Sequence, residues 1–187
     1  MTKKACGKKL LSAPMPTVLV GANVNGVPNY MTAAWYSIAC MAPPMVVVAI
    51  NQTRHTLEGI RETKSFSINI PSIHQVEATD YCGITSGKNS DKSKIFANFY
   101  GNLKTAPMIE ECPINLECRL FTITECGSHV LCVGEVVDTF AKDDIFSDDT
   151  PDVRKVDPII YLNGKYYRVG EYLNDAFSVG KNLKKKK

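Results

Sequence analysis

The sequence predicts one mainly β domain with a few short helices, and three observations carry this prediction. Runs rich in β-branched residues recur on both sides of a short helical stretch, Asn-Gly pairs mark tight turns between them, and no change of composition marks a second domain. The 187 residues, 44% hydrophobic and 22% charged, are typical of a folded chain with a single core. We therefore expect one β-barrel with added helices.

The first strands are expected as a hairpin followed by a buried strand. Residues 17–22 are rich in β-branched side chains, and Asn25-Gly26 is a strong hairpin signal because both residues tolerate positive φ. The chain is expected to return as a strand over residues 28–40, which a proline pair then ends. Residues 45–50 form a continuous apolar run, which is typical of a buried strand.

Three short helices and one strand are expected next. Thr56 can cap a helix that ends near Lys64. Residues 65–70 alternate polar and apolar side chains, which predicts a strand with one buried face. A second helix is expected over residues 71–81 and a third over residues 91–96, with a polar loop between them.

The second half of the chain is expected to be mainly β. Residues 114–124 and 129–140 are long strand candidates joined by a Gly-Ser turn. Residues 159–162 are expected to pair with residues 166–169 across an Asn-Gly turn. Residues 141–157 hold six acidic side chains, so this segment is expected to be a surface loop.

Charge is unevenly distributed along the chain. The formal net charge is +3, but nine of the 22 Lys and Arg residues lie near the two ends, and the remaining 13 oppose 19 acids, which gives the body about −6. We divide the chain into a basic N-terminal segment (1–12), a domain (13–175) and a basic C-terminal tail (176–187), whose closing lysines are expected to be solvated and disordered. No basic stripe flanked by aromatic residues is visible, so we expect no nucleic-acid partner.

Compartment and metal content are also constrained by the sequence. No apolar run approaches the roughly 20 residues that span a bilayer, and the stretch after the first lysines has no signal-peptide cleavage site. Seven cysteines without a C-x-x-C pair are not typical of a disulfide framework or a zinc site, and three scattered histidines do not favour a metal site. We expect a cytoplasmic protein with no membrane association and no metal.

Candidate binding residues lie at strand ends and helix starts, whereas the common nucleotide and hydrolase motifs are missing. The candidates form three groups along the chain: Asn29, Thr32, Trp35 and Ser37; Asn51, Thr53 and Thr56; and Ser86, Gly87, Asp91 and Lys92. A helix N-terminus with a hydroxyl and a nearby lysine can hold a phosphate monoester. Thr56 and Lys92 are the strongest candidates, and the alternatives are a simple helix cap and a solvated helix residue.

Several blocks, read together, resemble the flavin reductase-like family. Two are fairly specific: R-H-T-L-E-G-I-R-E-T-K-S-F-S-I-N-I-P from Arg54 and D-Y-C-G-I-T-S-G-K-N-S-D-K from Asp80. Less specific blocks, in consistent order, begin at Pro14, Pro28 and Ala42 and continue from Ala106 to Tyr166. The likeness covers about 160 residues and is strongest to the flavoredoxins within the family. It implies an FMN-binding split β-barrel.

The resemblance also implies residue roles. Asn29 and Trp35 would contact the flavin, and Thr56 and Lys92 would contact the ribityl-phosphate arm. The residues with weaker assignments are Ser86 and Gly87 as loop contacts, His129 beside the cofactor and Tyr161 flanking the ring. The resemblance further implies a homodimer, because this barrel usually completes its flavin site at the subunit interface.

The activity implied by the resemblance is that of a flavin-dependent oxidoreductase of the flavoredoxin type. Electrons would pass from NADH, NADPH or a redox protein through FMN to an acceptor. Hydride transfer needs no dedicated acid or base, so no catalytic side chain is assigned. Three alternatives stay open: a flavin reductase that releases reduced flavin, a noncatalytic FMN electron carrier, and a β-barrel domain whose pocket is unused or degenerate.

Overall fold

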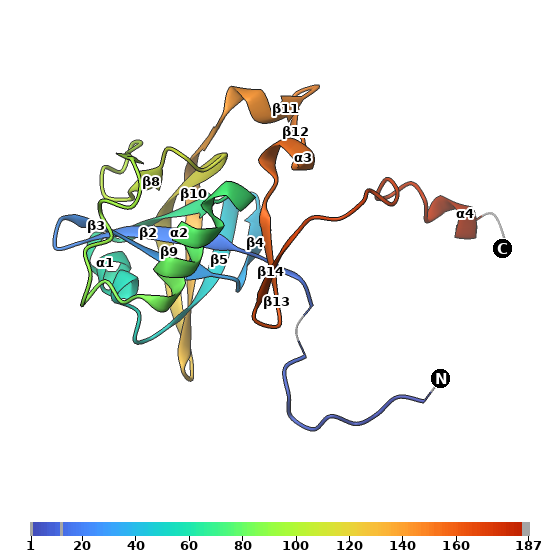
Figure 1. Ribbon diagram of the computed structural model, residues 1–187, viewed down its shortest axis with the longest axis horizontal. Helices are drawn as coiled ribbons and strands as arrows, with labels where there is room; N and C mark the ends of the chain where they lie inside the picture. Colours follow the sequence, from blue (N-terminus) through green and yellow to red (C-terminus); the bar gives the residue numbers. More distant parts are fainter. Residues whose placement is uncertain (1, 12, 185–187) are drawn as a thin grey trace.

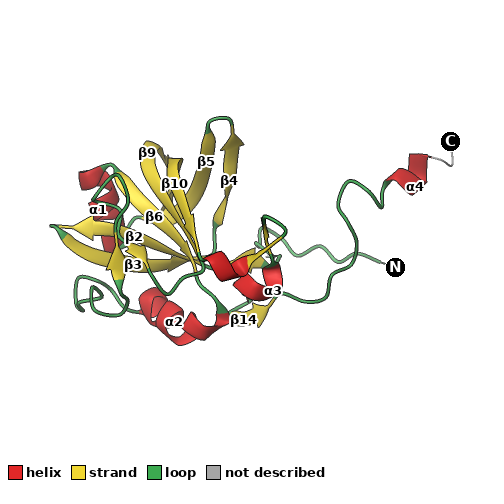
Figure 2. Cartoon of the chain, turned by 90° about the horizontal axis from the view of Figure 1, so that it is seen from above, coloured by secondary structure: helices red, strands yellow, loops and turns green. Residues whose placement is uncertain are grey.

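The computed structural model describes residues 2–11 and 13–184. Within these residues, seven antiparallel strands form the main sheet in the order β3-β2-β6-β9-β10-β5-β4 (Figures 1 and 2). Their bounds are Val18–Val24 (β2), Val27–Ala33 (β3), Tyr36–Met41 (β4), Pro44–Asn51 (β5), Ser65–Ile70 (β6), Ile114–Cys126 (β9) and His129–Ala141 (β10). The predicted mainly β class with short helices is confirmed.

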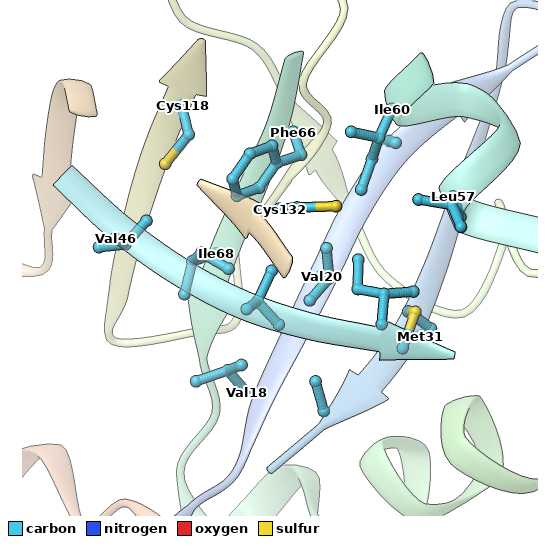
Figure 3. Packing of buried hydrophobic residues seen from close by; sticks show 14 of the residues in the cluster. Val18, Val20, Met31, Val46, Leu57, Ile60, Phe66, Ile68, Cys118 and Cys132 are labelled. Atoms are coloured by element: carbon cyan, nitrogen blue, oxygen red, sulfur yellow. The ribbon is translucent and has the colours of Figure 1, made fainter. Parts of the chain in front are cut away.

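The hydrophobic core lies on the inner face of this curved sheet. Alternate residues of strands from both halves of the sheet meet there, among them Val20 of β2, Val46 of β5, Phe66 of β6 and Cys132 of β10 (Figure 3). Alternation follows from the two-residue period of a strand. Because strands near opposite edges share one core, the sheet is rolled into a barrel.

The predicted single strand over residues 28–40 is wrong, because the chain divides there into β3 and β4. Strand β3 pairs with β2 at one edge of the sheet, whereas β4 pairs with β5 at the other edge. The chain crosses between the two edges at Ala34 and Trp35. This crossing leaves the Trp35 side chain outside the core, 45% exposed.

Strand β6 is buried on both faces, contrary to the prediction of one buried face. Its polar residues are covered by the segment 102–109, which Glu117 fixes by accepting hydrogen bonds from the backbone of residues 102 and 103. Asn69 Nδ2 donates to Leu19 O at 3.0 Å, and Asn69 Oδ1 accepts from Ile109 N at 3.0 Å. The alternating polar residues of β6 are therefore buried groups with hydrogen-bond partners, and not a solvent-exposed face.

The first two predicted helices are present, whereas the third is not. The described helices are α1 (His55–Thr63), η1 (Ile73–Gln75), α2 (Val76–Ile84), α3 (Val153–Val156) and α4 (Lys181–Lys184), with a further short 3₁₀ turn η2 (Asp143–Ile145). The second predicted helix corresponds to η1 and α2, and the Ser72 capping box begins it. The third, over residues 91–96, is not a helix. Asp91 Oδ1 instead accepts hydrogen bonds from the backbone and hydroxyl of Ser93, which closes a turn.

Smaller elements complete the body. A three-stranded sheet joins β1 (Met15–Pro16), β13 (Ile159–Leu162) and β14 (Lys165–Arg168), and short pairs join β7 (Asn98–Phe99) to β8 (Met108–Ile109) and β11 (Phe146–Ser147) to β12 (Thr150–Pro151). The predicted hairpin at β13 and β14 is confirmed. The acidic segment 141–157 is not the plain surface loop of the prediction, because it contains η2, β11, β12 and α3 and buries its own Ile145 and Val156 side chains.

Both chain ends extend away from the body (Figures 1 and 2). The closing lysine run was expected to be disordered, but its last three residues, 185–187, lie outside the described residues, as do residues 1 and 12. Of the helices that the structure describes, none has the length and apolar character needed to cross a membrane.

Candidate functional site

Two adjoining cavities lie where β3, β5 and β10 meet the helices. The larger cavity has a volume of about 370 Å³ and lies between the chain crossing at Trp35, helix α2 and the β13–β14 hairpin. The smaller cavity, about 190 Å³, lies at the start of α1 beneath the loop that follows α2. Met31 and Arg54 line both cavities, so together they form one elongated site.

One wall of the larger cavity is aromatic. The rings of Trp35 and His129 lie with their centroids 4.6 Å apart and their planes inclined by 36°. His129 begins β10 opposite Asn51 of β5, and Ala49 N donates to Trp35 O at 2.9 Å. The β5 ladder therefore fixes both rings at the rim of the barrel, where a flat ring could pack against them.

The opposite wall comes from α2 and the β13–β14 hairpin. Tyr166 donates its hydroxyl proton to Asp80 Oδ1 at 2.9 Å, and its ring meets that of Tyr161 edge to face at 6.1 Å. Burial and the hydrogen bond to Asp80 raise the pKa of Tyr166 to about 12. Tyr166 is therefore a neutral phenol at neutral pH, held in one orientation.

Thr56 lies inside the first turn of α1 and does not cap it, so the cap prediction is wrong. The N-cap position belongs to Arg54, which has extended backbone angles, and Thr56 is buried two residues farther on. Thr56 Oγ1 accepts a 2.7 Å hydrogen bond from Asn29 Nδ2. Because its lone pair serves Asn29, the hydroxyl proton remains as a donor beside the smaller cavity.

Lys92 is a buried residue and not a solvated helical one. Its side chain is 3% exposed, and its ammonium donates to Tyr30 O and Cys82 O, at 3.0 Å each. Burial lowers the pKa of this lysine. An ammonium has three protons, so one N–H remains beyond these two bonds in the wall of the smaller cavity.

Arg54 adds a second cation that was not selected from the sequence. Its Nη1 donates to Gly83 O at 2.7 Å, which places the guanidinium between α1 and α2 at the junction of the two cavities. The first N–H groups of α1 point out of the helix in the same region. Two cations and a helix N-terminus together favour an anionic group in the smaller cavity.

Gly87 allows the loop after α2 to approach β3 and α1. A Cβ atom at this position would lie 2.0 Å from Asn29 Oδ1 and 2.9 Å from His55 Cδ2. A larger residue would displace either the Asn29 side chain, which Thr56 holds by a hydrogen bond, or the loop itself. The cavity wall therefore depends on this glycine.

The structure brings together most of the sequence-selected residues. The larger cavity is lined by Thr32, Trp35, Asn51, His129 and Tyr161, and the smaller one by Asn29, Thr53, Thr56, Ser86, Gly87 and Lys92. Asp91 lines a neighbouring hollow beside Asn29 and Lys92. Ser37 is not brought to the site, because it lies exposed on β4 and donates its hydroxyl proton to the neighbouring Ile38 O.

Comparison with known proteins identifies the family. The family model described as "Flavin reductase like domain" matches residues 10–170. The chain belongs to the flavin reductase-like family.

Two solved structures and one further relative by sequence extend this result. A flavoredoxin from Methanosarcina acetivorans is 40% identical, with a TM-score of 0.95, and the match covers 98% of this chain and 100% of that one. A flavoredoxin of Desulfovibrio vulgaris (Miyazaki F) is 38% identical, with a TM-score of 0.88, over 96% and 100% of the two chains. An NADH:FMN oxidoreductase of Rhodococcus erythropolis is 23% identical over 142 residues, 75% of this chain and 68% of that protein.

Three residues of this flavin reductase-like site were missed at the level of sequence: Arg54, Asp80 and Tyr166. A signal existed for Arg54, since an arginine between a strand and a helix start lies where anions bind. Asp80 and Tyr166 are 86 residues apart and meet only because the β13–β14 hairpin packs beside α2. No local sequence pattern predicts a hydrogen bond between residues so far apart.

Proposed function

We propose that this chain binds FMN, with the isoalloxazine ring in the larger cavity and the phosphate in the smaller one. The observation that carries the proposal is the junction of an aromatic-walled cavity with a cationic one through shared Arg54 and Met31. FMN has the same division, a flat aromatic ring joined to a phosphate. The names of the relatives, two flavoredoxins and an NADH:FMN oxidoreductase, support the same cofactor.

The phosphate end would be held by charge and by hydrogen bonds. Arg54, Lys92 and the first N–H groups of α1 would supply positive potential, and the Thr56 hydroxyl would donate a hydrogen bond. The Ser86–Gly87 turn would close the outer side. Charge-assisted contacts of this kind are shorter and stronger than neutral ones, so this end would contribute most of the specificity for a phosphorylated flavin.

The ring end would be held mainly by packing. Trp35 and His129 would cover one side of the ring, and Tyr161 would flank it from the β13–β14 hairpin. Asn29 would reach the flavin near the junction of the cavities. When bound, FMN supplies hydride and electron transfer, while the protein orients the ring and excludes water from it.

The activity we propose is that of a flavin-dependent oxidoreductase of the flavoredoxin type. Reducing equivalents would come from NADH, NADPH or a redox protein and pass to an acceptor. The first alternative is a flavin reductase that releases reduced flavin to another enzyme. The second is a noncatalytic electron carrier that exchanges electrons with a protein partner only.

We also propose that the protein acts as a homodimer. The larger cavity is open beside Trp35, whose indole is 45% exposed although it is a large apolar group. A second copy against this side would cover the indole and narrow the mouth of the cavity. Sedimentation of the flavin-loaded protein as a monomer would contradict this assembly.

The visible spectrum of the purified protein, before and after dialysis, tests FMN binding. A flavin band that survives dialysis, and that bleaches on anaerobic addition of NADH or NADPH, is the expected result. Loss of FMN on dialysis with continued NADH turnover would favour the releasing reductase. A retained band that neither nucleotide bleaches would favour the carrier, and a colourless protein that takes up no added FMN would overturn the proposal.

Trp35 offers a second test that is independent of turnover. It is the sole tryptophan of the sequence, so tryptophan emission reports on the larger cavity alone. Addition of FMN is expected to quench more than half of this emission, with the same Kd as that from flavin fluorescence. FMN binding without quenching would place the ring elsewhere.

A further inference from the structure

The C-terminal arm, residues 171–184, exposes large apolar side chains that a folded protein ordinarily buries. Phe177 is 98% exposed and Leu173 is 86% exposed, and Tyr172, Val179 and Leu183 are also exposed. The hydrogen bonds described for the arm join residues of the arm itself, such as Tyr172 to Asp175. A contiguous exposed apolar segment of this kind marks an interaction site.

The direction and the length of the arm favour a partner over the body of its own chain. The arm leaves beside the β13–β14 hairpin and points away from α1, as does the N-terminal segment (Figures 1 and 2). Residues 171–175 have no regular structure, whereas residues 176–180 form turns and Lys181–Lys184 form α4, so the arm reaches roughly 30 Å. A body of this size is about 40 Å across. The arm is therefore long enough to reach well onto the surface of a second body of equal size.

A surface suited to such an arm lies on the outer face of β5 and β10. Val47 lies opposite Val133 in the ladder, with Met45 and Leu131 as neighbours, and these four residues define the outer strip. They alternate with the core residues Val46, Val48, Val130 and Cys132, so they point away from the core. All four remain partly exposed.

The sequence of β5 also indicates that this face is covered. Residues 45–50 are apolar without interruption, a pattern typical of a strand buried on both faces. The core covers only alternate residues of the strand. A sheet face exposed to water usually carries polar residues, so the outer strip needs an apolar cover, which the described residues of a single copy do not supply.

The arm and the outer strip are complementary in their placement. The arm leaves from the side of the body that carries the edge strand β4 (Figure 2), and β4 pairs with β5. In a twofold dimer each copy offers one arm and one strip on the facing side, so the exchange is reciprocal. Charge favours it as well, since the chain ends in lysines from residue 181 onward, whereas residues 13–170 hold 13 Lys and Arg against 17 Asp and Glu, about −4.

The area that the arms offer is on the scale of a stable interface. Buried aromatic residues cover roughly 150–250 Å² each. Tyr172 and Phe177 from two arms would therefore contribute roughly 600–1,000 Å² before the surface beneath them is counted. A stable interface needs about 1,200–2,000 Å² in total. Two exchanged arms would thus supply a large part of it.

We infer that the C-terminal arm crosses onto a second copy of this chain and packs Tyr172, Leu173 and Phe177 against the outer strip of that copy. The inference rests on the proposed homodimer and adds the segment that holds the two copies together. The arm of one copy then lies beside the aromatic rim of the other copy's larger cavity, since Leu131 and His129 belong to the same strand.

Photo-crosslinking in the full-length protein tests the inference. Phe177 is replaced by p-benzoylphenylalanine, and the irradiated protein is expected to give a product of twice the chain mass, crosslinked to residues 45–47 or 131–133. The matched control carries the same group at Val27, which is exposed on the hairpin between β2 and β3 and should give no such product. A crosslink within one chain, a crosslink elsewhere, or none at all would overturn the inference.

A full-length variant separates this inference from the proposed homodimer. Combining Tyr172→Ser, Leu173→Ser and Phe177→Ser is expected to raise the dimer dissociation constant at least tenfold by sedimentation equilibrium. Glu171→Ser with Asn174→Ser, polar positions in the same arm, should change it less than threefold. If the unmodified chain is monomeric, the homodimer itself fails. If the apolar variant dimerises as tightly as the unmodified chain, only the exchanged arm is refuted.

Discussion

The side-chain amide of Asn29 donates a 2.7 Å hydrogen bond to the hydroxyl of Thr56, and both residues are buried. This contact joins strand β3 to helix α1 at the wall of the smaller cavity. It also fixes the Thr56 hydroxyl as an acceptor for Asn29, so that its proton can serve a bound anion. Two residues that seemed independent in the sequence thus act as a pair.

Replacing Thr56 by valine is expected to weaken FMN binding roughly 10-fold or more, because a hydrogen bond to a charged group contributes about 1.5–3 kcal/mol. It also leaves the Asn29 amide without its acceptor. Thr56→Ser retains the hydroxyl and should bind FMN within about threefold of the unmodified protein. Flavin fluorescence titration measures both constants. Equal affinity in the valine variant would exclude Thr56 from the phosphate site.

Replacing Lys92 by methionine removes the buried ammonium but keeps the length of the side chain. We expect FMN binding to weaken roughly 10-fold at low salt and by less at high salt, since salt screens the lost attraction. The carbonyls of Tyr30 and Cys82 lose their donor, so the free energy of unfolding should also fall by about 1–3 kcal/mol. FMN titrations across a salt series and urea unfolding measure the two effects.

Lys88 provides the matched control for Lys92. It lies on the same loop, but its ammonium is exposed and pairs with Glu58 at 2.7 Å. Lys88→Met should change the FMN affinity less than threefold at any salt concentration, because an exposed ion pair contributes little. If the two variants respond to salt alike, the effect belongs to the overall charge and not to Lys92.

Gly87→Ala is expected to displace the loop after α2. The new Cβ would lie 2.0 Å from Asn29 Oδ1, which is closer than atoms can approach. Overpacking of this kind costs about 1–3 kcal/mol, and FMN affinity should fall at least tenfold as the cavity wall moves. Gly170→Ala, where an added Cβ meets nothing within 4 Å, is the control and should leave both quantities unchanged. Unchanged FMN binding in Gly87→Ala would contradict the role of this loop.

Tyr166→Phe tests the contact with Asp80 through its pH dependence. The pKa of Tyr166 is about 12 in the folded protein and 10.0 without the fold, so its stabilisation is complete below pH 10 and is lost as the pH rises toward 12. After allowance for screening by solvent, we expect the variant to be about 1 kcal/mol less stable at pH 8. Urea unfolding measures the free energy of unfolding of both proteins, and the difference between them should be about half as large at pH 11 as at pH 8. A constant difference would mean that the phenol does not titrate as proposed.

The fold was predictable where local patterns decide it. The Asn25-Gly26 turn, the long strands of the second half and the β13–β14 hairpin all follow from residue types that allow few other conformations. Predictions failed where a distant segment decides the outcome. Strand β6 is buried on both faces because residues 102–109 cover its polar side chains. The alternating sequence of β6 does not predict that a distant segment covers its polar face.

The sequence predicts which residues line the candidate site better than it predicts the contacts that those residues make. Most selected residues line the two cavities, yet Thr56 is no helix cap and Lys92 lies in no helix. Ser37 was selected for its place near Trp35, but the chain crossing at Trp35 turns it away from the cavities. Arg54 was passed over although it lines both of them. Which polar groups bind each other, and which stay available to a ligand, depends on contacts across the fold.

Lys92 has a consequence for how a ligand enters and leaves. Its two hydrogen bonds tie the loop after α2 to β3 and to α2 itself, so lifting this loop as a flap would break both at once. In a single copy the more open route passes Trp35, whose indole is 45% exposed. Along this route the phosphate must cross the larger cavity before it reaches Lys92, so it would enter first and the flavin ring last. In the proposed dimer the second copy would cover this route, so cofactor exchange would be slower in the dimer than in the monomer.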